Sequence, residues 1–263
     1  MAGRLILPRG AITSALPDLL IAPNKTESSA MHPITYIGPL EEWPDFMRDV
    51  ENSMREFPHS QRAVDFGLQS RDIRLERVYV ADETGLQGRF EQAVGQVLGA
   101  VFQVLDVDLR FGDSKSAGTG YEKIPDVALM SISPEWALSN IPVHKALGEI
   151  KTPWVSAHSI ASAYETEWKL GALIGQIVEY MIDEEVPYGF HTTYVETIFL
   201  QRVEVDGEWT VQYSPVIGKD LAKQCFWHLA MLAKDGVRIP KPSDTEKLDL
   251  ICHGPVRGRR RRR

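Results

Sequence analysis

Cysteine is scarce in this chain of 263 residues, which has only Cys225 and Cys252. Two cysteines cannot build the disulfide network that stabilises small secreted domains, and a reducing compartment is the simpler expectation. No apolar run approaches the ~18 residues of a membrane span, which predicts no membrane contact. Pro8 interrupts the short apolar stretch near the N-terminus, so a secretory signal is not expected. We therefore expect an intracellular protein of the nucleus or the cytoplasm.

Several catalytic motifs are also missing from the chain. There is no Gly-x-Ser-x-Gly elbow and no Gly-x-x-x-x-Gly-Lys-[Ser/Thr] loop, and the glycine-containing stretch 112–120 lacks the phosphate-loop pattern. Cys252-His253 has no second pair of ligands, so a structural zinc site is not expected. Serine hydrolases, P-loop ATPases and Rossmann oxidoreductases therefore have no support.

The composition is that of an ordinary globular protein, with 43% hydrophobic and 25% charged residues. Six of the 29 basic residues lie in the last seven positions. The other 23 basic residues stand against 36 acidic ones, a net charge of −13. Such a cluster of arginines is typical of nucleic-acid binding or of nuclear import. Its members are Arg257, Arg259, Arg260, Arg261, Arg262 and Arg263.

The chain divides into four parts by its patterns. Residues 1–35 lack periodicity and predict a loosely ordered arm. Residues 36–83 contain one amphipathic pattern and predict a short helical extension, which is a candidate contact for a protein partner. Residues 84–240 carry the strong patterns of a folded domain, and residues 241–263 form a tail that ends in the arginines.

Alternating periodicities predict a mixed α/β fold for the main domain. An apolar stripe over residues 89–105 indicates a helix, and strands are expected over 107–111, 124–130 and 146–151. A long helix is expected over 159–183. A strand over 193–205, a hairpin turn at Asp206-Gly207 and a return strand over 209–216 follow. A last helix is predicted over 219–234.

Two of the expected strands carry the residues that are best suited to binding a metal or to catalysis. Asp126 lies in the second strand, and Glu149-Ile150-Lys151 ends the third. Two carboxylates on adjacent strands can share a hard cation such as Mg²⁺ or Mn²⁺, with the Ile150 carbonyl as a further ligand. Alternation puts Glu149 and Lys151 on one face, where the lysine can hold an attacking water or help to deprotonate it.

These short patterns also occur elsewhere in the chain. Asp113-Ser-Lys115 lies in the glycine-containing loop, and Glu167-Trp-Lys169 lies inside the long helix. Only Asp126 and Glu149 fall in neighbouring apolar strands. The alternative interpretation is a coincidental strand-end carboxylate and a surface Glu–Lys pair.

The arrangement resembles the PD-(D/E)XK nuclease superfamily, which has the restriction-endonuclease-like fold. Pro125-Asp126 matches its first element and Glu149-Ile150-Lys151 its second. The resemblance implies an α-β-β-β-α-β core with a mixed central sheet flanked by helices; here a C-terminal hairpin and helix follow it. It also implies an acidic residue on the first helix, matched by Glu91, which would bind metal. It implies a glutamine on the helix after the motif, matched by Gln176.

A narrower resemblance involves two further segments. Residues 188–200 and 224–229 are similar to segments of uncharacterised filamentous-fungal proteins. Both resemblances together cover residues 84–235 and carry no information about the first 80 residues.

The resemblance implies a metal-dependent hydrolase, an endonuclease that cleaves phosphodiester bonds of DNA or RNA. Lys115 and Lys123, near the expected site, and the six arginines are the candidate nucleic-acid contacts. A fold that has lost turnover and serves as a binding or regulatory module is the main alternative. A self-interacting structural domain is another, and a homodimer stays open.

Overall fold

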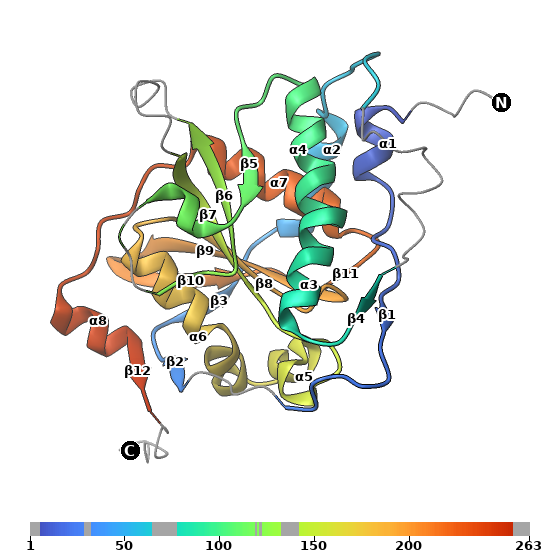
Figure 1. The fold of residues 1–263 in the computed structure, drawn as a ribbon. Coiled ribbons are helices and arrows are strands. Elements are labelled where there is room, and N and C mark those ends of the chain that lie inside the picture. Colours follow the sequence, from blue (N-terminus) through green and yellow to red (C-terminus); the bar gives the residue numbers. More distant parts are fainter. Residues whose placement is uncertain are drawn as a thin grey trace.

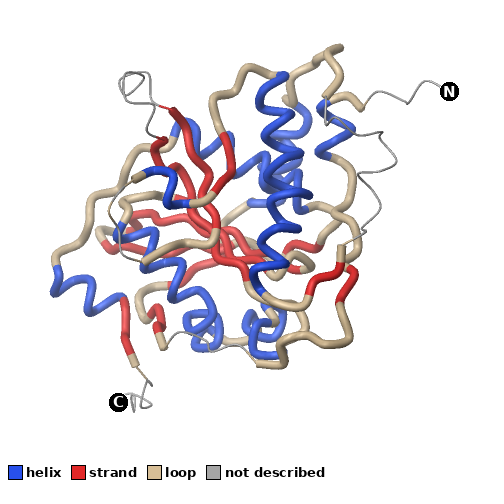
Figure 2. Tube along the Cα trace, in the orientation of Figure 1, coloured by secondary structure: helices blue, strands red, loops and turns tan. Residues whose placement is uncertain are grey.

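A computed structural model describes residues 6–28, 33–64, 78–118, 120, 123–132 and 142–254. Its centre is an eight-stranded mixed sheet in the order β3-β10-β9-β8-β7-β6-β5, with β11 paired to β9 (Figures 1 and 2). The strands are β3 Leu40–Glu42, β5 Arg110–Gly112, β6 Val127–Ile132, β7 Pro142–Ile150, β8 Tyr188–Thr192, β9 Glu196–Val205, β10 Glu208–Tyr213 and β11 Ile217–Gly218. This confirms the expected α/β class with a mixed sheet.

Helices cover both faces of the sheet and create two apolar cores (Figure 1). One core contains α1 Pro8–Ile12, α2 Phe46–Arg55, α4 Gln96–Val104 and α7 Ala222–Asp235, together with α3 Glu83–Phe90. A π-helical turn over Glu91–Gly95 joins α3 to α4. The other core contains α5 Ile160–Tyr164 and α6 Glu167–Asp183.

Strand pairing around β7 determines which residues meet. β5, β6 and β7 form an antiparallel meander, whereas β8 runs parallel to β7. A parallel neighbour requires a crossover connection, and α6 provides it between β7 and β8. Along β7, Ala146 and Ile150 enter the first core and Leu147 enters the second. Alternation therefore directs Glu149 to the face covered by α6.

A strand was expected over 193–205, but β9 begins only at Glu196, and a further strand that was not expected, β8, ends at Thr192. Tyr194 has a φ of 72°, in the left-handed region, and it separates β8 from β9 as the turn of a hairpin. The expected turn at Asp206-Gly207 is confirmed, since both residues have positive φ, as a type I′ hairpin turn requires.

The described part of residues 1–35 is not a loose arm. Ile12 is fully buried, and α1 packs against α4 and α7. β1 Leu20–Ile21 pairs with β4 Tyr79–Val80. Thr26 then bridges two later segments, because its N–H donates to the Ala81 carbonyl at 2.8 Å and its carbonyl accepts from Trp154 Nε1 at 2.8 Å. The expectation of an arm failed because these contacts are long-range and leave no local periodicity.

The described parts of the expected extension and tail also pack into the fold. Helix α2 confirms the amphipathic pattern, and it packs on α7, while β3 lies at the edge of the central sheet. Near the C-terminus, α8 Asp244–Leu250 leads to β12 Ile251–His253, which pairs with β2 Ile34–Tyr36. Short 3₁₀ turns occupy Ser114–Ala117 and Ser156–His158. Among the described residues, none of the helices is both long and apolar enough to cross a membrane.

Glycines on two helices provide a test of the packing. A Cβ at Gly175 of α6 would overlap the Ile34 carbonyl of β2, whereas a Cβ at Gly99 of α4 would meet no atom within 4 Å. Gly175→Ala should lower the free energy of unfolding by about 1–3 kcal/mol through overpacking. Gly99→Ala should raise it by up to ~1 kcal/mol, because alanine favours the helix. Urea unfolding measures both, and equal effects would contradict the packing of β2 on α6.

Candidate active site

Asp126 lies immediately before β6, where it is fixed by two hydrogen bonds. Its Oδ2 accepts from the backbone N–H of Ile150 at 2.7 Å, and its Oδ1 accepts from Gln87 Nε2 at 2.7 Å. The first bond joins β6 to the end of β7, and the second joins both strands to α3. The carboxylate therefore has one defined position at the junction of three elements.

Glu149 and Lys151 lie on one face, as the alternation predicted. Lys151 Nζ is 2.7 Å from Glu149 Oε1, and Ile150 between them is fully buried in the first core. Lys151 Nζ also donates to both oxygens of Glu83, at 3.2 Å each. Because Glu83 is on the first turn of α3, the lysine ties this helix to the end of β7.

The cluster of Glu83, Asp126, Glu149 and Lys151 has three carboxyl groups for one ammonium group. Burial and the charge of Asp126 raise the pKa of Glu149 to about 8, although Lys151 opposes the shift. Burial also raises the pKa of Asp126 to about 6, against the Ile150 N–H and Lys151. Burial lowers the pKa of Lys151, but the carboxylates outweigh it and the net shift is upward. The lysine is therefore a charged donor, and the cluster has more carboxyl groups than its single positive charge can pair.

Gln176 is hydrogen-bonded to a neighbour on its own helix, Tyr180, which interacts electrostatically with the cluster. Its Nε2 donates to the Tyr180 hydroxyl at 2.7 Å. Burial raises the pKa of Tyr180 to about 12, with further contributions from the charges of Glu149 and Asp126. Tyr180, which was not among the predicted site residues, is thus a residue of α6 that feels the charge of the carboxylates. A glutamine and a tyrosine four residues apart on one helical face were the available signal.

Glu91 begins the π-helical turn that joins α3 to α4. Its side chain extends over Gly95, where a Cβ would overlap it, and Oε1 is buried with no hydrogen-bond partner among the described residues. Burial and the nearby Asp113 raise its pKa to about 7. Glu83, about two turns earlier, is the helical carboxylate that reaches Lys151. The missed signal was Glu83 and Gln87 at a four-residue spacing, which places them on one face.

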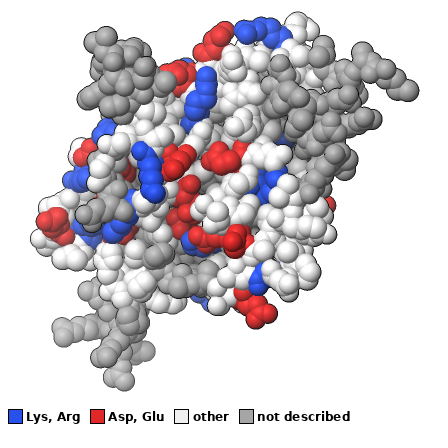
Figure 3. Space-filling view, viewed as in Figure 1, with Lys and Arg blue, Asp and Glu red and all other residues white. Residues whose placement is uncertain are grey.

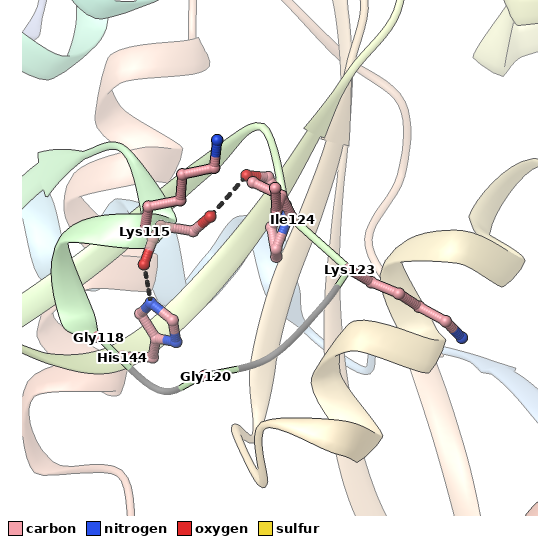
Figure 4. A pocket seen from close by; sticks show the side chains of 8 residues that line it. Lys115, Gly118, Gly120, Lys123, Ile124 and His144 are labelled. Atoms are coloured by element: carbon pink, nitrogen blue, oxygen red, sulfur yellow. Dashed lines mark hydrogen bonds between the residues drawn. The ribbon is translucent and has the colours of Figure 1, made fainter.

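The two lysines predicted to contact nucleic acid lie in different environments. Lys115 is exposed and lines a pocket of about 200 Å³ beside Pro125 (Figure 4). Lys123 also lines the pocket, but its side chain extends away from it and its Nζ lies 2.6 Å from Glu179 of α6. Residues 257 and 259–263, the predicted arginine contacts, lie outside the described residues. Figure 3 shows acidic side chains near the middle of one face, with a few basic ones beside them.

The residues present fit a hard divalent cation. Glu149 Oε2 is buried without a hydrogen-bond partner among the described residues, and Asp126 is the second oxygen donor on the neighbouring strand. Magnesium prefers oxygen ligands and keeps several waters, so one or two carboxylates suffice. Within the described part of the chain, no three His, Cys, Asp or Glu side chains form a metal-binding group.

The comparisons with known proteins found no matching family model, no matching curated protein and no matching solved structure.

The buried Glu91 predicts a pH-dependent stability. Its pKa is 4.5 as the ordinary value and about 7 in the fold, so the folded state keeps a proton that the unfolded chain has lost. The free energy of unfolding therefore falls as pH rises from about 4.5 to 7. Glu91→Gln should stabilise the protein by about 1 kcal/mol or more at pH 8 and by little at pH 5.

Urea unfolding at the two pH values measures this difference. The exposed Glu56→Gln is the control and should show no such dependence. An equal effect of Glu91→Gln at pH 5 and pH 8 would contradict the burial of this carboxyl group.

Proposed function

We propose that this protein is a metal-dependent nuclease that hydrolyses phosphodiester bonds of DNA or RNA. The observation that carries the proposal is the convergence of Asp126, Glu149 and Lys151 at one end of two paired strands, with Glu83 from α3 beside them. Buried carboxylates of raised pKa next to a charged lysine are a common feature of catalytic sites.

The strand connections support a restriction-endonuclease-like core. A helix, an antiparallel meander of three strands, a crossover helix and a fourth strand parallel to the third follow one another over residues 83–192. This order is the α-β-β-β-α-β order implied by the resemblance to the PD-(D/E)XK superfamily. Asp126 lies immediately before the second strand of that core, and Glu149 lies on the third.

Each residue has a definable role in such a reaction. Asp126 and Glu149 would hold Mg²⁺ or Mn²⁺, which when bound polarises phosphate oxygens and lowers the pKa of a coordinated water. Lys151 is protonated, so it would orient the water and stabilise negative charge on the phosphate rather than act as a base. Gln87 and the Ile150 N–H fix the Asp126 carboxylate, and Glu83 fixes Lys151. Tyr180 presents its hydroxyl group from α6.

Strand cleavage is the direct test of this function. Labelled DNA and RNA, single- and double-stranded, are incubated with Mg²⁺ or Mn²⁺. Asp126→Asn and Lys151→Met should each lower the cleavage rate by about a hundredfold or more, because each removes transition-state stabilisation. Lys169→Met is the matched control, since Lys169 has the same acid-x-Lys spacing on the exposed face of α6, and it should cleave normally.

The outcomes separate the two candidate functions. Cleavage that all three folded variants retain would place the activity at another site or in a contaminant. Binding of metal and nucleic acid without any cleavage would favour the binding or regulatory module instead.

The two helical glutamates allow a second test. Glu83→Gln removes a partner of Lys151, so we expect cleavage to fall by about tenfold or more. Glu91→Gln alters a carboxyl group whose charged neighbour is Asp113, so cleavage should be retained. The initial rates of the two variants, measured at saturating Mn²⁺, give the comparison. The reverse ranking would show that Glu91 is the functional acid, as the resemblance to the family implies.

A further inference from the structure

His191 of β8 is buried without a hydrogen-bond partner. The residue is 2% exposed, and neither Nδ1 nor Nε2 forms a hydrogen bond with the described residues. The three other histidines that are buried in the described part of the chain, His144, His158 and His228, each form at least one hydrogen bond. A buried polar group without a partner costs stability, so its retention points to a role in binding or catalysis.

Strand pairing places His191 beside Glu149. The two residues are register partners in the parallel pair of β7 and β8, and these strands lie about 4.8 Å apart. Phe190, the preceding residue, enters the first core, whereas Ile198, the partner of His191 on β9, enters the second. His191 therefore lies on the face that α6 covers, which is also the face of Glu149.

Glu149 has the complementary deficiency. Its Oε1 is held by Lys151 at 2.7 Å, whereas its Oε2 is buried and accepts no hydrogen bond from the described residues. Burial and the charges of Lys151 and His158 lower the pKa of His191 to about 3, so its ring is neutral and carries one N–H donor. A carboxyl oxygen without a donor thus lies on the strand next to an N–H without an acceptor.

Cation binding changes what Glu149 requires. In the structure its carboxyl group pairs with Lys151, whereas a cation shared with Asp126 requires an ionised carboxylate directed at the metal. A buried carboxylate remains charged only when it is paired and hydrogen-bonded. Donors that orient metal-binding carboxylates contribute about ten- to hundredfold to metal affinity. The ring N–H of His191 can serve as such a donor.

We propose that His191 is a positioning residue of the candidate cation site. Its ring N–H donates to the Glu149 carboxylate and holds it in the orientation that binds the metal. His191 touches neither the metal nor the substrate. This inference rests on the cation site of the proposed function and adds to that site a residue from a third strand, β8.

Substitutions at residue 191 separate this role from a structural one. His191→Leu removes both ring nitrogens, whereas His191→Asn and His191→Gln keep an N–H near the place of Nδ1 and of Nε2, respectively. In calorimetry, His191→Leu should bind Mn²⁺ about ten- to hundredfold more weakly than the unaltered protein. One of the two amide variants should bind nearly as tightly as the unaltered protein and the other should not, because only one places its donor towards Glu149.

Stability in EDTA is the second measurement. An apolar side chain in place of an unpartnered buried imidazole removes a desolvation cost, so the urea midpoint of His191→Leu should be unchanged or higher. His228→Leu is the matched control, since His228 is also buried but its Nδ1 is hydrogen-bonded to Ser53 Oγ at 2.7 Å. This control should have a lower urea midpoint and an unchanged affinity for Mn²⁺.

Several results would overturn the positioning role. They are unchanged Mn²⁺ affinity in His191→Leu, a urea midpoint of this variant as low as that of the control, an equal loss of affinity in His228→Leu, or equal affinities of the two amide variants. The last comparison is decisive even if His191→Leu does not fold.

The failure of the proposed function is distinguishable from these results. If the unaltered protein binds no Mn²⁺, the cation site is absent and the role of His191 is overturned with it. If Mn²⁺ binds but nucleic acid is not cleaved, only the nuclease activity fails, because metal affinity is measured without nucleic acid.

Discussion

The excess of buried negative charge at the end of β7 is the constraint on which the rest of the site depends. Glu83, Asp126 and Glu149 surround one lysine, and burial makes each unpaired charge expensive. Without a further positive charge, the cluster keeps a proton, as the raised pKa of Glu149 indicates. A divalent cation can take the place of that proton. The same property that destabilises the charged cluster thus makes it suitable for binding metal.

The surrounding fold holds this arrangement in place. The antiparallel register of β6 and β7 brings Asp126 to the Ile150 N–H. The crossover through α6 brings Tyr180 close enough for the charges of Glu149 and Asp126 to help raise its pKa. The N-terminal segment contributes through Thr26, which bridges Ala81, two residues before Glu83, and Trp154, three residues after Lys151. Segments far apart in sequence therefore secure both sides of the Glu83–Lys151 ion pair.

Local periodicity was sufficient to predict how the site residues on the strands are oriented. It was insufficient to predict which helical residues join them. Alternation placed Glu149 and Lys151 on one face and Ile150 in the core because these properties depend only on neighbouring residues. Which acidic residue of the helix reaches Lys151, Glu83 or Glu91, depends on where α3 begins and on how it packs. Periodicity does not specify either property. Glu91 also begins a π-helical turn that changes the helical phase. The packed N-terminal segment was missed because the partner of its strand lies more than fifty residues away.

Titration of the protein with Mn²⁺ by calorimetry tests the central claim most directly. The unaltered protein should bind one ion per chain. The affinity should fall when the pH is lowered from 8 to 6, because the cation competes with the proton of Glu149. Asp126→Asn should lose most of this binding while keeping its fold. Equal binding by the unaltered and Asp126→Asn proteins, or no binding by the unaltered protein, would contradict a cation site built from Asp126 and Glu149.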